Sequence, residues 1–66
     1  MTVTEVEARV AKIAAEVDDP EVAHGCEDGL RRDVLAAIAN GEGDPPAALA
    51  KAALKTAELH FPRWYA

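Results

Sequence analysis

The sequence predicts a small all-α protein, a bundle of three helices in a single domain (residues 1–66) with a C-terminal aromatic tail. Three observations predict it. The chain has 66 residues, which suffices for one domain. Half of its residues are apolar and fifteen are alanine, the residue that most favours helix. Apolar residues recur at helical spacing, and no run shows the period of two that is typical of a strand.

The first helix is predicted from Thr4 to Val17. Thr4 and Glu7 fit the Ser/Thr-x-x-Glu capping box, in which each side chain satisfies a backbone amide of the first turn. One face of this helix is apolar and comprises Val6, Val10, Ile13 and Val17. The opposite face is charged, with helical ion pairs expected at Glu5–Arg9 and Lys12–Glu16.

The second helix is predicted from Pro20 to Asn40, with Asp19 as its cap and proline in its first turn. Gly25 and Gly29 each cost about 1 kcal/mol inside a helix, so the alternative is a loop at 24–28 followed by a shorter helix. A four-residue apolar spacing continues across both glycines and favours one helix. The richest apolar face of the chain, expected at the centre of the core, comprises Leu30, Val34, Leu35 and Ile38.

The third helix is predicted from Pro45 or Pro46 to about His60, with Asp44 as its cap. Pro62 ends it, because the residue before a proline avoids the α region. The inward face is expected to comprise Leu49, Ala50, Ala53, Leu54 and Ala57, continued by Phe61. Short connections between the three helices favour antiparallel neighbours, hence a bundle.

Residues with chemical reactivity are few. His24 and Cys26 lie two positions apart, and side chains at that spacing point to different sides of a helix, which disfavours a Cys–His nucleophile. One thiolate and one imidazole are too few ligands for a zinc site. The carboxylates form no acid–base pair, and no glycine-rich phosphate loop is present. We therefore expect no enzyme, no metal and no cofactor, with Cys26 as a small buried apolar residue.

Charge and hydropathy exclude several classes of partner. The net charge is −5, with −6 in residues 1–28 and +1 in residues 29–66. An acidic chain repels phosphate backbones, so we expect no nucleic-acid partner; Arg31 and Arg32 are expected to pair with Glu27 and Asp28, one turn earlier. No apolar run approaches the roughly 20 residues that span a bilayer, so no membrane partner is expected. A free thiol without a signal peptide indicates a cytoplasmic protein.

All three aromatic residues lie in the last six positions, as Phe61, Trp64 and Tyr65. Because Trp, Tyr and Arg dominate binding hot spots, the candidate partner-binding residues are Arg63, Trp64 and Tyr65. The alternative is that Trp64 and Tyr65 fold over the open end of the bundle while Arg63 faces water. A chain of this size has a small core, which favours tight packing or a homodimer, and the tail could also pack across such a dimer.

Residues 28–40 and the ending Phe61-Pro62-Arg63-Trp64-Tyr65-Ala66, with the Ala- and Leu-rich stretch between them, resemble small uncharacterised proteins of actinobacteria and their bacteriophages. The ending is the most specific part of this resemblance. The resemblance implies an accessory role, that of a phage protein acting on host machinery. The predicted function is a non-enzymatic protein-interaction module that binds a host protein. The alternative is an acidic DNA mimic or antitoxin-like inhibitor that acts through its N-terminal half.

Overall fold

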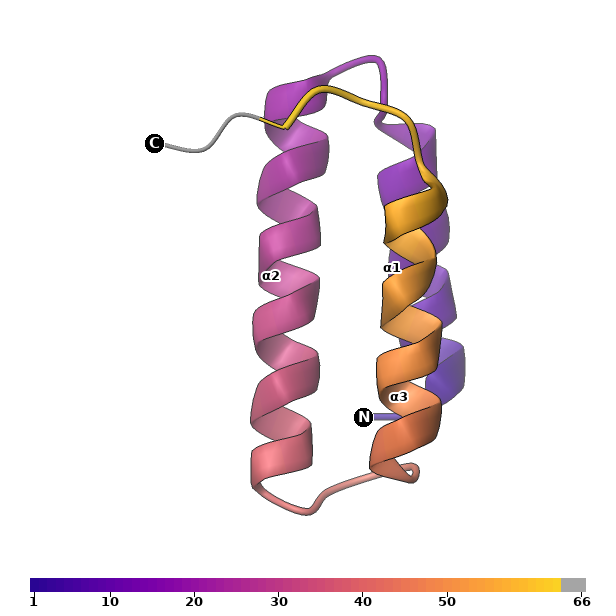
Figure 1. Cartoon of the computed structure of the whole chain (residues 1–66), viewed down its shortest axis with the longest axis vertical. Helices are drawn as coiled ribbons and strands as arrows, with labels where there is room; N and C mark the ends of the chain where they lie inside the picture. The colour runs from indigo at the N-terminus through magenta and orange to yellow at the C-terminus, as the bar shows by residue number, and fades with distance from the viewer. Residues whose placement is uncertain (64–66) are drawn as a thin grey trace.

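The computed structural model describes residues 1–63, which form three α-helices running up, down and up (Figure 1). The helices are α1 (Val3–Ala15), α2 (Pro20–Ala39) and α3 (Pro46–Ala53), and the 3₁₀ helix η1 (Leu54–Glu58) continues α3. α2 and α3 lie side by side on the broad face of the molecule, with α1 behind α3 in this view. Residues 1–63 contain no strand. The predicted all-α three-helix bundle is therefore confirmed.

α1 begins at Val3, one residue earlier than predicted, and its cap lies two residues earlier than Thr4, so the capping box at Thr4 and Glu7 is wrong. Thr2 is the cap, and its hydroxyl accepts a hydrogen bond from the Glu5 amide at 3.1 Å. The same Thr-x-x-Glu pattern occurs at residues 2–5 and 4–7, so the local motif fits both registers. A distant contact favours the first register, because the Asp44 carboxylate accepts from the Val3 amide at 2.7 Å.

Asp44 therefore accepts from the first amide of α1 and does not cap α3, contrary to prediction. Pro45 occupies the cap position of α3, where no side-chain hydrogen bond is made. The Asp44 amide also donates to the Met1 carbonyl at 3.0 Å, which fastens the α2–α3 loop to the N-terminus. Gly43 makes this approach possible: its φ is +85°, and a Cβ there would run into the backbone of Met1.

α2 is continuous from Pro20 to Ala39, so the alternative with a loop at 24–28 is wrong. Its cap is as predicted, with the Asp19 carboxylate accepting from the Val22 amide at 3.4 Å. A Cβ at Gly25 would meet open space, and one at Gly29 would make ordinary contacts with two arginine side chains. Neither glycine is therefore needed for a turn or for close packing.

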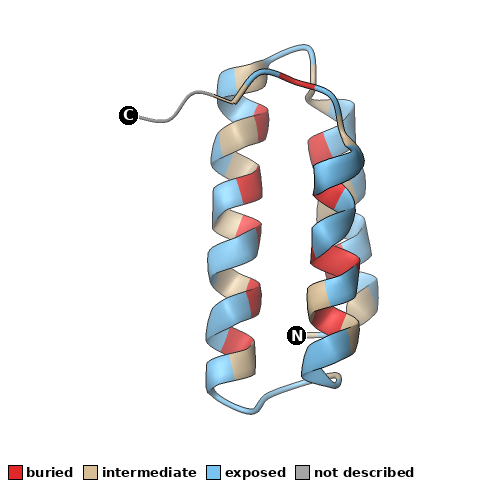
Figure 2. Ribbon diagram, in the orientation of Figure 1, coloured by how far each residue is buried: buried red, intermediate tan, exposed pale blue. Residues whose placement is uncertain are grey.

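The core lies along the axis shared by the three helices, where buried residues face one another (Figure 2). Phe61 is 8% exposed and closes the upper end of the core, as the sequence predicts. On α1, Val6 and Ile13 are buried, while Val10 and Val17 pack partly buried against them. The buried cluster comprises Val6, Ile13, Ala23, Leu30, Val34, Leu49, Ala52, Ala53 and Phe61.

Three residues expected in the core are on the surface. Leu35 is 65% exposed, Leu54 is 64% exposed, and Ala57 is also exposed. Each helix of a three-helix bundle turns only a narrow stripe to the centre, and successive residues point about 100° apart. On α2 that stripe passes through Val34, so Leu35 points aside. The third helix changes to 3₁₀ at Leu54 and ends at Glu58 rather than His60, and Thr56 takes the inward position.

Substitution by alanine should change the free energy of unfolding in opposite directions at a glycine of α2 and at a glycine of the α2–α3 loop. Gly25→Ala is expected to stabilise the fold by about 0.5–1 kcal/mol, because it lowers the entropy of the unfolded chain without meeting any neighbour. Gly43→Ala is expected to destabilise it by more than that, since it meets both a positive φ and the Met1 backbone. Urea unfolding of the two variants beside the parent measures both signs; a destabilised Gly25→Ala would contradict the unbroken α2.

Candidate functional site

Glu27 is a carboxylate in the core. It occupies an inward position of α2, on the same stripe as Ala23, Leu30 and Val34, and is 1% exposed. Burying an ionised carboxylate is costly unless it is paired and hydrogen-bonded. The charged groups around Glu27 therefore decide whether this end of the bundle is stable.

Arg63 supplies the principal partner of Glu27. Its Nε donates to Oε1 at 2.8 Å and its Nη2 donates to Oε2 at 2.9 Å, the bidentate geometry that suits a guanidinium. The same Nη2 donates to the Thr56 carbonyl at 3.0 Å, and the guanidinium carbon lies 3.9 Å from the centre of the Phe61 ring. The expectation that Arg63 faces water is thus wrong, since only 21% of its side chain is exposed.

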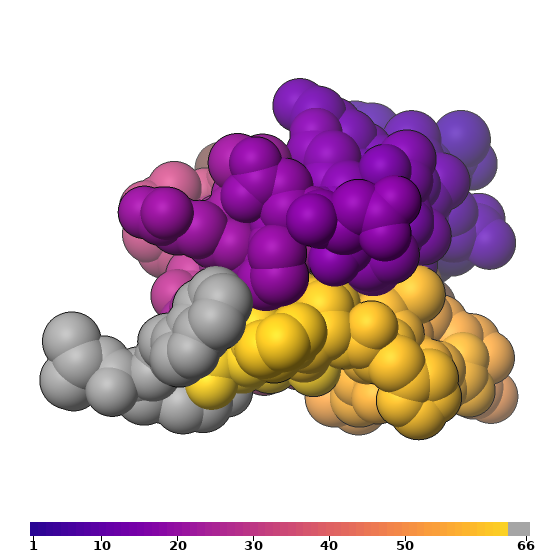
Figure 3. Space-filling model, turned by 90° about the horizontal axis from the view of Figure 1, so that it is seen from above, coloured from indigo at the N-terminus to yellow at the C-terminus, as the bar shows by residue number. Residues whose placement is uncertain are grey.

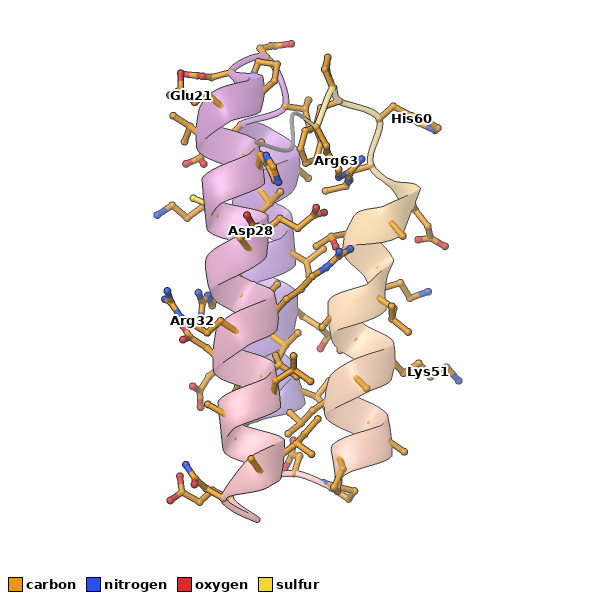
Figure 4. All side chains as sticks on the ribbon, turned by 60° about the vertical axis from the view of Figure 1, so that its left-hand side comes forward. Glu21, Asp28, Arg32, Lys51, His60 and Arg63 are labelled. Carbon is orange, nitrogen blue, oxygen red and sulfur yellow. The ribbon has the colours of Figure 1, made fainter. Side chains whose placement is uncertain are left out.

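Figures 1 and 3 show how the chain reaches this pairing. From the end of η1, the yellow residues cross the top of the bundle toward the start of α2 (Figure 1). Seen from above, they lie against the purple residues around the α1–α2 turn (Figure 3). Arg63 points inward between α2 and η1, whereas Arg32, Lys51 and His60 point outward (Figure 4).

The pairing keeps Glu27 ionised. Hydrogen bonding to Arg63 lowers the pKa of Glu27 most; Thr56 and the positive charge of Arg31 lower it further, while burial raises it. The net effect is a pKa below the ordinary value of a glutamate. The buried carboxylate is therefore held as an anion by the cations around it.

Arg31 links this ion pair to the surface of the bundle. Its Nη2 lies 3.7 Å from Glu27 Oε2, which confirms the predicted pairing, and donates to the Thr56 hydroxyl at 3.2 Å. The predicted partner of Arg32 is wrong: Arg32 Nε lies 3.4 Å from Asp33 Oδ1. Across the helices, Arg9 Nη1 donates to Asp33 Oδ2 at 2.8 Å, and among residues 1–63 neither Glu5–Arg9 nor Lys12–Glu16 forms an ion pair.

Beside Arg31, an apolar groove opens between α2 and α3. It has a volume of about 310 Å³ and is open to solvent. Leu35 and Leu54, the two most exposed large apolar side chains among residues 1–63, form its rims. Small residues form part of its floor, and among the residues that the structure describes Arg31 is the one charged residue that lines it. The apolar lining comprises Val34, Leu35, Ile38, Ala50, Ala53 and Leu54.

His24 and Cys26 do not form a catalytic pair. The half-buried Cys26 thiol donates to Glu16 Oε2 at 3.5 Å, and its pKa is raised by burial and then by Glu16, so it stays protonated. His24 Nε2 lies 3.4 Å from Asp28 Oδ2, on another side of α2. Within residues 1–63, no three His, Cys, Asp or Glu side chains gather where they could hold a metal ion.

Of the three residues predicted to bind a partner, the structure describes Arg63 alone. Trp64 and Tyr65 lie outside the described residues, and their role stays a prediction. Neither the burial of Glu27 nor the apolar groove is predicted from the sequence. Glu27 could have been found from its spacing to Ala23, Leu30 and Val34, which places a carboxylate on an apolar stripe.

Removing one member of the buried pair should cost more than removing both. Arg63→Met leaves Glu27 buried beside Arg31 alone, and a loss of about 3 kcal/mol is expected. Glu27→Met should also destabilise the fold, whereas the double variant should recover much of the loss because no unpaired charge remains. Denaturant unfolding of the four proteins measures the coupling; additive single losses would show that the pair does not act as a unit.

The pair should also set the acid stability of the fold. Because the pKa of Glu27 is lower in the folded chain, its contribution is complete above the unfolded pKa of about 4.3. That contribution is lost as the pH falls through the folded pKa, below about 4.3. Glu27→Gln should therefore be less stable near neutral pH but lose less stability on acidification. Unfolding free energies between about pH 3 and pH 7 test this, with Glu7→Gln on the exposed face of α1 as the control.

Among the helices of residues 1–63, none has the length and apolar character to cross a bilayer. Comparisons of this chain with protein-family models, curated proteins and solved structures found no match.

Proposed function

We propose that this protein is a non-enzymatic interaction module whose α2–α3 groove receives an amphipathic helix of a partner protein. The observation that carries the proposal is the pair of leucines, Leu35 and Leu54, that stand 65% and 64% exposed on either side of an apolar groove. Clustered apolar surface on a small protein is typical of an interaction site. Amphipathic helices bind such grooves through residues at a spacing of three and four.

The shape of the groove suits a helix. Its walls are two neighbouring helices, and Ala50 and Ala53 form part of its floor, so the axis of a third helix can approach closely. α1 already packs on the other side of α2 and α3. A helix in the groove would turn the three-helix bundle into a four-helix arrangement and would cover both exposed leucines.

The proposal keeps two of the three partner-binding residues predicted from the sequence and gives the third, Arg63, a structural role. Arg63 is bound to Glu27, so its role is to hold the tail on the bundle at the start of α2. Trp64 and Tyr65 follow directly and are proposed as additional partner contacts. The proposed partner is a host protein and this chain a phage accessory protein, on the strength of the resemblance of residues 28–66.

An acidic inhibitor that mimics DNA is the second candidate. The observation that favours it is the exposure of acidic side chains along α1 and the α1–α2 turn: Glu5, Glu7, Asp18, Asp19 and Glu21. Reversal of Glu5, Glu7 and Glu21 to lysine is the matching test, since Glu16 is occupied by the Cys26 thiol. Partner capture that survives this reversal would set the candidate aside.

Capture of a partner from host lysate tests the proposed function. Separate variants of the groove and of the tail measure the contribution of each to partner binding. Leu35→Glu should reduce recovery of the partner at least about tenfold, because it places a charge in the apolar contact. Val22→Glu is the matched control, since Val22 is also apolar and exposed but lies outside the lining of the groove. A Trp64→Ala/Tyr65→Ala variant keeps Arg63 and measures the two rings alone. Equal recovery with the parent and Leu35→Glu would overturn the groove as the docking site.

A further inference from the structure

We propose that the partner helix carries an acidic side chain that pairs with Arg31, about one helical turn beyond its apolar anchors and on the same face. This inference rests on the proposed function of the groove as a helix-docking site, and it names the chemistry of the helix that fits. An apolar stripe alone would accept many amphipathic helices. The cation in the lining restricts the choice to helices with a carboxylate at one position.

Arg31 carries a charge that the bundle does not balance. The buried anion beside it is Glu27, and Arg63 binds both carboxylate oxygens of Glu27 at 2.8 and 2.9 Å. Arg31 Nη2 lies further away, 3.7 Å from Glu27 Oε2. The same nitrogen donates to the hydroxyl of Thr56, which is neutral. Two guanidinium groups therefore share one carboxylate, and this cluster has a net positive charge.

Arg31 also keeps hydrogen-bond donors for a ligand. Both of its contacts within residues 1–63 involve Nη2, so Nε and Nη1 make no hydrogen bond to that part of the chain. Asp28 lies 3.4 Å from His24, and Asp33 accepts from Arg9 at 2.8 Å, so both of these neighbouring acids have other partners. The Arg31 side chain is 43% exposed. A guanidinium in this state can bind a further carboxylate.

A helix in the groove has to deal with this cation. It would remove water from the guanidinium of Arg31, and burying a charge is costly unless the charge is paired and hydrogen-bonded. A carboxylate on the helix offsets that cost. A lysine at the same position would instead add a second positive charge beside a net positive cluster. Arg31 therefore favours acidic helices and rejects basic ones.

The spacing along α2 gives the position of the acid. Ile38, Leu35 and Arg31 line the groove at successive spacings of three and four residues, about 10 Å in all. The partner helix has the same rise per residue. Anchors opposite Ile38 and Leu35 therefore place its carboxylate three or four residues beyond the second anchor. Arg32 and Lys51 point outward, so they do not compete with Arg31 for it (Figure 4).

A displayed library of helices of about 18 residues tests the pairing with a defined probe. Leucines recur at spacings of three and four on one face, and the other positions are random. Selection on the parent chain should enrich Asp or Glu three or four positions beyond a leucine. Selection on Arg31→Gln should lose this preference. Arg32→Gln is the matched control and should keep it, because Arg32 is 78% exposed and outside the lining. Circular dichroism verifies the fold of both variants.

A peptide taken from the selection then measures the pair itself. Replacing its acid by Gln should weaken binding to the parent about tenfold, but binding to Arg31→Gln by less than about twofold. Equal losses with both proteins would overturn the pairing.

The failure of this inference can be told from the failure of the proposed function. Helices that bind the parent but not Leu35→Glu, and that show no preference for an acid, overturn the pairing and leave the docking site standing. If the library yields no binder, or binders that Leu35→Glu retains, both the docking site and the pairing are wrong. A parent chain that is a dimer, and that Leu35→Glu converts to a monomer, would show that a second copy fills the groove and would also overturn the inference.

Discussion

The buried ion pair between Glu27 and Arg63 is the interaction on which the upper end of this protein depends. A core that holds few large apolar side chains also contains an ionised carboxylate, 1% exposed. The guanidinium satisfies that carboxylate in bidentate fashion and also donates to the carbonyls of Thr56 and Leu59. The Leu59 carbonyl lies just past the end of η1, where no further helical turn supplies an amide donor, and the Thr56 carbonyl also accepts from the Leu59 amide. One side chain thus satisfies a buried charge and a helix end together.

The path of residues 59–63 follows from this pairing. Because Arg63 must reach Glu27, the chain leaves η1 and crosses the top of the bundle, and Phe61 is placed over the core on the way. The guanidinium then packs on the ring of Phe61 at 3.9 Å. The same short segment therefore both closes the core with Phe61 and pairs the buried carboxylate with Arg63. The ion pair therefore separates the three aromatic residues into two groups. Phe61 belongs to the core, while Trp64 and Tyr65 follow Arg63, which is bound to Glu27.

What could be predicted from the sequence was mostly local. The cap at Asp19, the proline that starts α2 and the apolar spacing across two glycines are all signals within a few residues, and α2 matches them. The start of α1 was missed because Thr-x-x-Glu occurs twice, and the deciding contact comes from Asp44, 41 residues away. Leu35 was misplaced because Val34 and Leu35 both extend an apolar face, and only tertiary packing selects between them. Glu27 shows a local signal, but its partner lies 36 residues further along the chain.

Arg31 connects the groove to the Glu27–Arg63 ion pair. The distances from Glu27 to the two arginines indicate how strongly occupation of the groove affects that pair. Arg31 lines the groove and lies 3.7 Å from Glu27, whereas Arg63 holds the same carboxylate at 2.8 Å. A helix that fills the groove and draws Arg31 toward itself therefore removes the weaker of two cations and leaves the bidentate pair in place. Coupling between two sites can be no larger than the free energy of the contact they share. Since the contact of Arg31 is the longer one, we expect Arg63 to stay bound to Glu27 whether or not the groove is filled.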